Sequence, residues 1–167
     1  MNIILKQATL ELAPSFWSAL DTVARERRYL IFTEAPPLEK TLAFVTEIIE
    51  KGWSQYYAIH DDRVIGWCDV VRKERSGLTH SGILGVGILP EFRKQGLGRR
   101  LMTTTIEDAF SKGLQRIELE VFASNKRAAH LYRKLGFVEE GRKIKARYLD
   151  GVYDDFILMA LIKNNSE

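Results

Sequence analysis

The first half of the chain changes its hydrophobic period from element to element. Apolar residues three and four positions apart predict helices over Pro14–Tyr29 and Leu38–Lys51. Pro36 and Pro37 predict a loop between them. Shorter apolar runs predict strands at Ile3–Ala8, Gln55–His60, Arg63–Arg72 and Thr79–Leu89. Because only Asp61 and Asp62 separate the second strand from the third, we expect an antiparallel hairpin there.

The second half alternates helices and strands. The pattern predicts helices at Gly96–Ser111 and Asn125–Leu135, and strands at Gln115–Phe122, Phe137–Arg147 and Val152–Ile162. Asp150 and Gly151 form a hairpin signal between the last two strands. The strands on either side of Gly96–Ser111 form a β-α-β unit, which should be parallel and right-handed. The sequence therefore predicts an α/β (α+β) fold, a mixed and mostly antiparallel central sheet of about seven strands flanked by about four helices.

Length and charge narrow the class of protein. A chain of 167 residues fits a single domain spanning residues 1–167. The net charge of +3 favours a site for an anionic ligand, but there is no long Lys/Arg block, so we expect no nucleic-acid partner.

Cysteine usage and hydropathy bear on the compartment. Cys68 is the single cysteine, which rules out a disulfide within the chain and suits a reducing cytoplasm. The first residues lack a signal-peptide pattern, and the chain has no apolar run approaching the roughly 18 residues that span a bilayer. We therefore expect a cytoplasmic protein with no membrane partner.

The stretch from Arg93 to Arg100 carries the most specific chemistry. It follows a predicted strand and opens a predicted helix, where free backbone amides and the helix dipole attract an anion. Gly96 and Gly98 let the backbone turn sharply and approach a ligand closely. The basic side chains Arg93, Lys94, Arg99 and Arg100 add positive charge, so a pyrophosphate is the expected ligand. A solvated basic turn is the alternative interpretation.

Two other nucleotide motifs fit this loop less well. A Walker A loop needs Lys and then Ser or Thr after its second glycine, whereas Arg99 follows Gly98 here. A dinucleotide fingerprint needs a third glycine at the position of Leu101.

Two motifs together resemble a known superfamily. Arg93-x-x-Gly96-x-Gly98 is similar to the acetyl-CoA signature of the GNAT (GCN5-related) N-acetyltransferases. The segment Leu119–Asn125, followed by Ala128-Ala129, Leu131-Tyr132 and Leu135-Gly136-Phe137, resembles the next strand and helix of that superfamily. The likeness is strongest to the ribosomal-protein alanine N-acetyltransferases, and loop features also resemble polyamine and amino-acid acetyltransferases.

The resemblance implies acetyl-CoA as the cofactor and a role for each matching residue. The pantetheine arm would pair with the backbone of Val86, Gly87 and Ile88, and Asn125 would bond the cofactor near its thioester. Tyr132 would protonate the departing thiolate and Glu120 would take the proton of the amine. The cofactor-binding set implied is Val86, Gly87, Ile88, Arg93, Lys94, Gln95, Gly96, Leu97, Gly98, Arg99, Asn125, Ala128 and Tyr132.

The chemistry of amine acetylation agrees with these roles. An ammonium ion cannot attack a thioester, so a base must first remove its proton, and a carboxylate with a pKa raised by burial can do so. We expect helices on both faces of the sheet to bury Glu120 and expect Glu118 to be structural or exposed. His80 or a water molecule remains an alternative base. The three histidines lack metal-ligand spacing, so no metal is expected.

The acceptor is the least specified part of the prediction. Acidic groups beside aromatic rings can receive a cationic amine, and the expected candidates are Glu34, Trp67, Asp69 and Tyr153. A small primary amine such as a polyamine or amino acid, a protein N-terminus, and a non-catalytic CoA-binding module remain open. A homodimer is expected from the resemblance alone.

Overall fold

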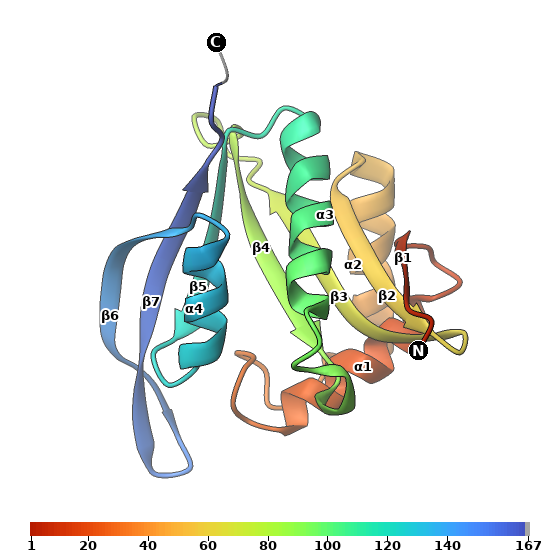
Figure 1. Cartoon of the computed structure of the whole chain (residues 1–167), viewed down its shortest axis with the longest axis horizontal. Helices are drawn as coiled ribbons and strands as arrows, with labels where there is room; N and C mark the ends of the chain where they lie inside the picture. The colour runs from red at the N-terminus through yellow and green to blue at the C-terminus, as the bar shows by residue number, and fades with distance from the viewer. Residues whose placement is uncertain (166–167) are drawn as a thin grey trace.

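The computed structural model describes residues 1–165, so the last two residues of the predicted 1–167 domain lie outside it. Seven strands form one sheet in the order β1-β2-β3-β4-β5-β7-β6 (Figure 1). The strands are β1 (Ile4–Gln7), β2 (Ser54–His60), β3 (Arg63–Arg72), β4 (Ser81–Ile88), β5 (Arg116–Phe122), β6 (Val138–Leu149) and β7 (Val152–Ile162). The helices are α1 (Ala13–Arg25), α2 (Leu38–Lys51), η1 (Pro90–Phe92), α3 (Leu97–Ser111) and α4 (Lys126–Lys134). The predicted fold class and element order are confirmed.

The element ends differ from the prediction by a few residues, for local reasons. The first helix ends at Arg25 rather than Tyr29, because Arg27 adopts a left-handed φ of 58° that a helix cannot continue through. A short 3-10 turn at Pro90–Phe92 was not predicted. It turns the chain from the end of β4 into the phosphate loop and buries Phe92. The helix α2 ends where expected, at Gly52 in the left-handed conformation.

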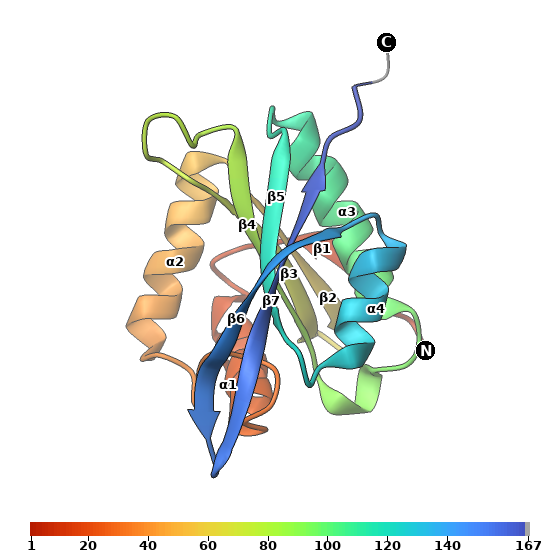
Figure 2. The same ribbon diagram turned by 90° about the vertical axis from the view of Figure 1, so that its left-hand side faces the viewer.

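The helices cover both faces of the sheet. Figure 2 shows α1 and α2 on one side and α3 and α4 on the other. The helix α1 packs on β3, β4 and α2, while α3 packs on β2, β3 and β4. Residues between the layers, such as Tyr57, Ile65, Leu101 and Met102, are almost fully buried. In the described part of the chain, no helix is both long enough and apolar enough to cross a membrane.

The sheet opens between its two parallel strands. β4 and β5 are paired only at their first residues, Ser81–Ile83 with Arg116–Glu118. Beyond that point β4 continues to pair with β3 up to Ile88, and β5 pairs with β7 up to Phe122. The two strands diverge in Figure 1, so the second half of β4 presents free backbone amides and carbonyls toward β5. This split positions the site described next.

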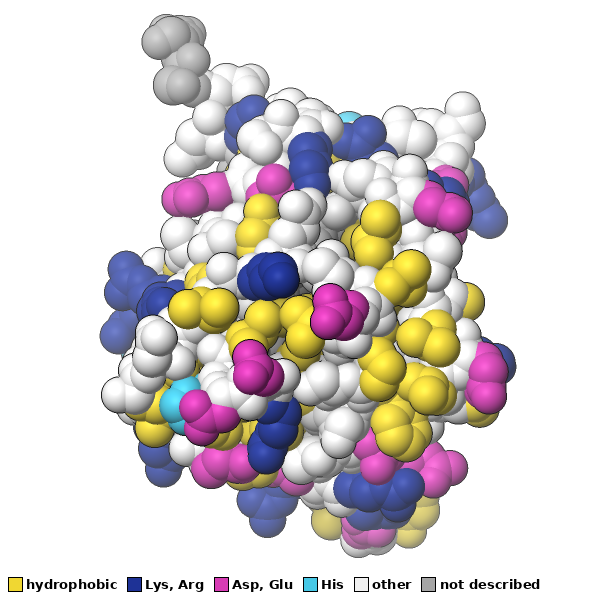
Figure 3. Space-filling model, turned by 90° about the vertical axis from the view of Figure 1, so that its right-hand side faces the viewer, with side chains coloured by type: hydrophobic (Ala, Val, Ile, Leu, Met, Phe, Trp, Pro, Cys, Tyr) yellow, Lys and Arg dark blue, Asp and Glu magenta, His cyan; other side chains and the backbone are white. Residues whose placement is uncertain are grey.

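Charge is mixed over the surface seen from the β1 side. Figure 3 shows basic and acidic side chains interspersed with apolar ones across this face. The small positive excess is therefore not concentrated into one field there.

Candidate active site

A cavity of about 550 Å³ lies where β4 leaves β5, between the phosphate loop, the start of α3 and α4. Of the residues predicted to bind the cofactor, all but Gln95 line it. Gln95 is exposed, and its Nε2 donates to the carbonyl oxygen of Glu91 at 3.4 Å. The structure thus brings one set of predicted residues, far apart in the sequence, to one continuous cavity.

The phosphate loop has the backbone geometry of an anion site. Gly96 caps α3 with a φ of 76°, a conformation that favours glycine, and Lys94 also has a positive φ of 66°. The first backbone amides of α3 have no hydrogen-bond partner within the helix. They belong to Leu97–Arg99, which line one end of the cavity. Within residues 1–165, the exposed side chains of Lys94 and Arg99 form no ion pair, so their charge is available to a ligand.

The expectation that the Arg93 side chain adds positive charge to the phosphate loop is wrong. Its side chain does not add free charge to the loop, because it is bound inside the protein. Its Nε donates to the carbonyl oxygen of Ile88 at 2.9 Å, and its two terminal nitrogens donate to Glu26 at 2.8 and 2.5 Å. The guanidinium also lies over the ring of Tyr29, with 4.7 Å between its carbon and the ring centroid. Arg93 therefore ties the loop to β4 and α1, and Glu26 neutralises its charge.

Tyr132 lies on α4 with its side chain in the same cavity. It is buried, and burial raises the pKa of its phenol, so the hydroxyl stays protonated at neutral pH. Asn125 caps this helix, and its Oδ1 accepts from the amide of Ala128 at 3.3 Å. The cap holds the first turn of α4 at the cavity, which fixes where Tyr132 points.

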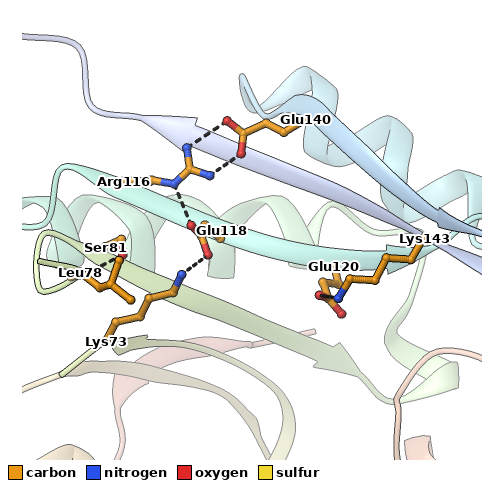
Figure 4. Close-up of polar contacts among 8 residues, drawn as sticks. All are labelled: Lys73, Leu78, Ser81, Arg116, Glu118, Glu120, Glu140 and Lys143. Atoms are coloured by element: carbon orange, nitrogen blue, oxygen red, sulfur yellow. Dashed lines mark hydrogen bonds and ion pairs between the residues drawn. The ribbon is translucent and has the colours of Figure 1, made fainter. Parts of the chain in front are cut away.

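Glu118 and Glu120 lie on one face of β5, as Figure 4 shows. Glu118 accepts from Lys73 at 2.5 Å and from Arg116 at 2.8 Å. Burial alone would raise the pKa of Glu118, but these two cations outweigh it and the pKa is lowered. Glu118 is therefore held as an anion in a structural network that also joins Arg116 to Glu140.

The expected burial of Glu120 is wrong. Its side chain is 44% exposed and pairs with Lys143 at 2.9 Å (Figure 4). The reason is that α1 packs on β3 and β4 rather than on β5, so this side of β5 is open to solvent. The catalytic role of Glu120 stays a prediction, but the burial expected for its side chain is not present.

A second cavity of about 320 Å³ lies on the α1–α2 face of the sheet. It contains two of the four predicted acceptor residues, Trp67 and Asp69. Val86 of β4 lines both cavities. The other lining residues of the second cavity are Phe16, Leu20, Leu30, Ile31, Phe32, Pro36, Lys40, Thr41, Phe44 and Gly85. Helical spacing predicted the two helices that carry several of these residues, but it could not show that the residues leave a hollow.

The other predicted acceptor residues lie elsewhere. Glu34 is 69% exposed, and its carboxylate is 3.5 Å from Arg25. Tyr153 is exposed in the β6–β7 hairpin, with its ring centroid 4.7 Å from that of Tyr148. His80, the alternative base, is exposed beside the start of β4 and lines neither cavity. In the described residues, no three His, Cys, Asp or Glu side chains gather as a metal site would need.

Comparison with known proteins identifies the family. Residues 17–137 match the model of the acetyltransferase (GNAT) family, which is most of the chain. The chain belongs to the GNAT acetyltransferase family. Acetyl-CoA is the cofactor of this family, and the split sheet, the glycine loop and Tyr132 are arranged as a site for it would require.

Curated GNAT relatives differ in the acceptor that their names give. The spermidine N(1)-acetyltransferase of Vibrio cholerae is 35% identical over 48% of this chain and 49% of its own length. A ribosomal protein bS18-alanine N-acetyltransferase of Escherichia coli is 37% identical over 50% and 57%, respectively. The L-amino acid N-acetyltransferase of Escherichia coli is 32% identical over 67% and 70%. The chain therefore spans about half the length of the first two relatives.

Solved GNAT structures share the whole fold. The acetyltransferase of Streptococcus pneumoniae superposes with a TM-score of 0.90 at 25% identity, covering 97% of this chain and 100% of that one. A phosphinothricin acetyltransferase of Sinorhizobium meliloti in complex with acetyl-CoA has a TM-score of 0.90 at 17% identity, covering 97% and 89%. At that identity the likeness concerns the fold alone.

Proposed function

We propose that this protein transfers the acetyl group of acetyl-CoA to the primary amine of a small molecule. One observation carries the proposal. A cavity lined by Gly96–Arg99 and Tyr132 shares the lining residue Val86 with a second, largely apolar cavity. The first has the features of a CoA site and the second is a separate pocket for an acceptor.

The residues of the first cavity fit acetyl-CoA in shape and chemistry. The α3 amides with Lys94 and Arg99 suit the pyrophosphate. The backbone of Val86–Ile88, unpaired on the β5 side, suits the amide groups of the pantetheine arm, which would add to β4 as a strand does. When bound, the cofactor supplies the acetyl group as a thioester.

Tyr132 would supply a proton to the sulfur as it leaves. A phenol with a raised pKa is protonated at neutral pH, so its hydroxyl can donate to the sulfur as negative charge develops there. The nitrogen would lose two protons as its bond to the acetyl carbon forms and the C–S bond breaks. A base takes one of them, and the other balances the proton that the departing sulfur gains. The site thus needs one proton donor and one acceptor, and Tyr132 is the donor.

The acceptor cavity favours a small molecule. Its volume of about 320 Å³ is at the lower end of the roughly 300–1,000 Å³ of small-molecule sites. A protein N-terminus is the second candidate, supported by the open face of β5 beside Glu120 and by the names of the ribosomal-protein relatives.

Thiol release from acetyl-CoA tests the proposal. Purified protein is mixed with acetyl-CoA and either a panel of free amines or short peptides with free N-termini. We expect thiol release with at least one free amine and a lower rate with peptides. Release with peptides alone would replace the proposal by the second candidate. Tight acetyl-CoA binding without thiol from any acceptor would point to a non-catalytic CoA-binding module.

A further inference from the structure

Asp69 is an acid buried where the acceptor cavity meets the sheet. It is 8% exposed, and in the β-sheet register it stands between Gln55 of β2 and Gly85 of β4. A Cβ atom on Gly85 would lie 3.2 Å from the Oδ1 of Asp69, so the carboxyl group rests against the β4 backbone. A side chain at position 85 would make this contact tighter than usual.

No cation of the described chain compensates this acid. Its nearest polar contact is the Nε2 of Gln55, 3.5 Å from Oδ2. Burial raises the pKa of Asp69 to about 7, and the hydrogen bond from Gln55 offsets only part of that rise. A buried, uncompensated carboxyl group is costly to a fold, which is a reason to look for a function.

A second buried polar group faces the same cavity. Thr41 of α2 is 3% exposed and lines the cavity, yet its Oγ1 has no hydrogen-bond partner within residues 1–165. Buried hydroxyls are nearly always paired, so one that lines a hollow without a partner indicates a ligand or water there. Thr41 and Asp69 together give the cavity a polar end.

The rest of the cavity is apolar. Aromatic rings from α1, α2 and β3 form much of the wall, namely those of Phe16, Phe44 and Trp67. Lys40, which is exposed, is the one cation in the lining among the residues described. An occupant with a single amine and an apolar body would match this distribution of groups.

We propose that Asp69 receives the ammonium group of the acceptor and takes its proton, and that the acceptor is a primary amine on an aryl or alkyl body without an acid next to the amine. This inference rests on the proposed function. The ammonium gives one proton to a carboxylate oxygen of Asp69, and the freed nitrogen forms the new bond to the acetyl carbon as the bond from that carbon to sulfur breaks. The nitrogen's second proton balances the one that the departing sulfur gains from Tyr132, and Asp69 later releases its proton to water.

The location of Asp69 suits this step. Its strand neighbour Gly85 and the next residue, Val86, both line the acceptor cavity, and Val86 also lines the cofactor cavity. A group held by Asp69 is therefore held at the junction of the two cavities. An ordinary carboxylic acid is about six pKa units more acidic than an alkylammonium, whereas an acid with a pKa near 7 narrows that gap by roughly half.

The same charges disfavour two other acceptor classes. An α-amino acid would bring its own carboxylate beside Asp69, and the one cation in the described lining, Lys40, is exposed rather than buried with them. A polyamine would place a second ammonium among apolar walls or near Lys40. Both arrangements leave a buried charge unpaired.

Few other titrating groups face Asp69. Tyr57 of β2, Cys68 of β3 and Lys40 of α2 are the ones near it or in its cavity. Burial raises the pKa of the Tyr57 phenol and of the Cys68 thiol, so both stay neutral around pH 7. In the described part of the chain, α1 and β4 contribute only apolar side chains and Gly85 to the cavity. A pH-dependent rate near pH 7 would thus report on Asp69.

Steady-state kinetics on three matched amines tests the inference. 2-Phenylethylamine, L-phenylalanine and spermidine are compared as acceptors with saturating acetyl-CoA, from pH 5.5 to 9. The variants are Asp69→Asn, Glu120→Gln and, as the matched control, Asp62→Asn in the exposed β2–β3 turn. Acetyl-CoA affinity is measured for each by calorimetry, and folding by thermal denaturation.

We expect kcat/KM for 2-phenylethylamine to exceed that for the other two amines by about tenfold or more, the effect of one unpaired buried charge. Asp69→Asn should lower kcat by about 10²-fold or more and remove the acidic limb of the pH profile, with acetyl-CoA affinity retained. Asp62→Asn should match the unmodified protein.

Three results would overturn the inference. They are a preference for spermidine or L-phenylalanine, an Asp69→Asn variant that keeps its rate, or loss of the acidic limb in Glu120→Gln instead. Each of these leaves the proposed acetyltransferase function standing. Acetyl-CoA binding with no thiol from any amine would remove the proposed function and this inference with it. If Asp69→Asn does not fold, the amine preference of the unmodified protein still decides the acceptor class.

Discussion

The indole ring of Trp67 lies directly against the backbone of Gly87, so closely that a Cβ atom at position 87 would be 2.2 Å from it. Trp67 is 3% exposed and belongs to the wall of the acceptor cavity, while Gly87 lines the cofactor cavity. The two residues are register partners on β3 and β4. Their contact is therefore the partition between the two halves of the site.

Gly87→Ala should disturb this partition. The new methyl group has to displace a packed ring, and overpacking of this kind costs about 1–3 kcal/mol of unfolding free energy. Gly141→Ala is the matched control, because its Cβ would meet its nearest atom, in Leu158, at 3.6 Å, an ordinary contact. Chemical denaturation of both variants checks the prediction. Equal stability of the two would contradict the packing described for Trp67.

Tyr132→Phe should separate chemistry from binding. The variant keeps the buried ring but lacks the proton that the leaving sulfur needs, so kcat should fall by about 10²-fold or more. Acetyl-CoA affinity should change little, because the ring and the capped helix remain. Thiol-release kinetics beside calorimetry checks this. A variant with unchanged kcat would mean that water or another group protonates the thiolate.

Glu26→Gln should loosen the phosphate loop. Losing the carboxylate turns a paired, partly buried contact with Arg93 into a neutral one, and hydrogen bonds to charged groups contribute about 1.5–3 kcal/mol. Acetyl-CoA affinity should fall as well, because ordering the loop then costs binding free energy. Each 1.4 kcal/mol of that cost weakens binding about tenfold.

The control for Glu26→Gln is Glu50→Gln, an exposed position on α2 that makes no ion pair with the described residues. If Glu26→Gln and Glu50→Gln behave alike in both melting and binding, Arg93 does not hold the loop in the way that its contacts indicate.

Asp69 should make stability depend on pH. Its pKa is about 7 in the folded protein, raised from 3.8. Between these values the folded state holds a proton that the unfolded state has lost. The contribution of Asp69 to stability should therefore be fully present below the unfolded pKa and should fall by up to about 1.4 kcal/mol per pH unit as the pH rises toward 7. Asp69→Asn removes this pH-dependent contribution to stability. The melting temperature of the variant should therefore rise relative to that of the unmodified protein between pH 5 and pH 8. A constant difference across that range would show that Asp69 titrates at its ordinary pKa.

The order of the elements, the hairpins and most residues of the candidate cofactor site could be predicted from the sequence because they depend on local signals. Hydrophobic period, the Asp150–Gly151 turn and the glycines of the phosphate loop each act within a few residues. Most of the residues that line the first cavity come from two blocks, Val86–Arg99 and Asn125–Tyr132. A motif in each block was therefore enough to identify most of them.

Long-range contacts explain where the prediction was wrong or incomplete. The exposure of Glu120 depends on α1 packing over β3 and β4, and the internal use of Arg93 depends on Glu26, 67 positions away in the chain. The pairing of Asp69 with Gly85 and the hollow beneath Thr41 likewise depend on how three strands and two helices meet. Hydrophobic periodicity and short motifs carry no information about such long-range contacts.

Calorimetric titration with acetyl-CoA tests the central claim most directly, with desulfo-CoA and ATP as comparison ligands. A cavity that binds both the pyrophosphate and the pantetheine arm should bind acetyl-CoA and desulfo-CoA with similar affinity. ATP lacks the pantetheine arm, so it should bind at least about tenfold more weakly, a difference of about 1.4 kcal/mol. If the folded protein binds neither CoA ligand, the cavity between β4 and α4 is not a cofactor site, and the account of Tyr132 and Asp69 as its proton donor and acceptor fails with it.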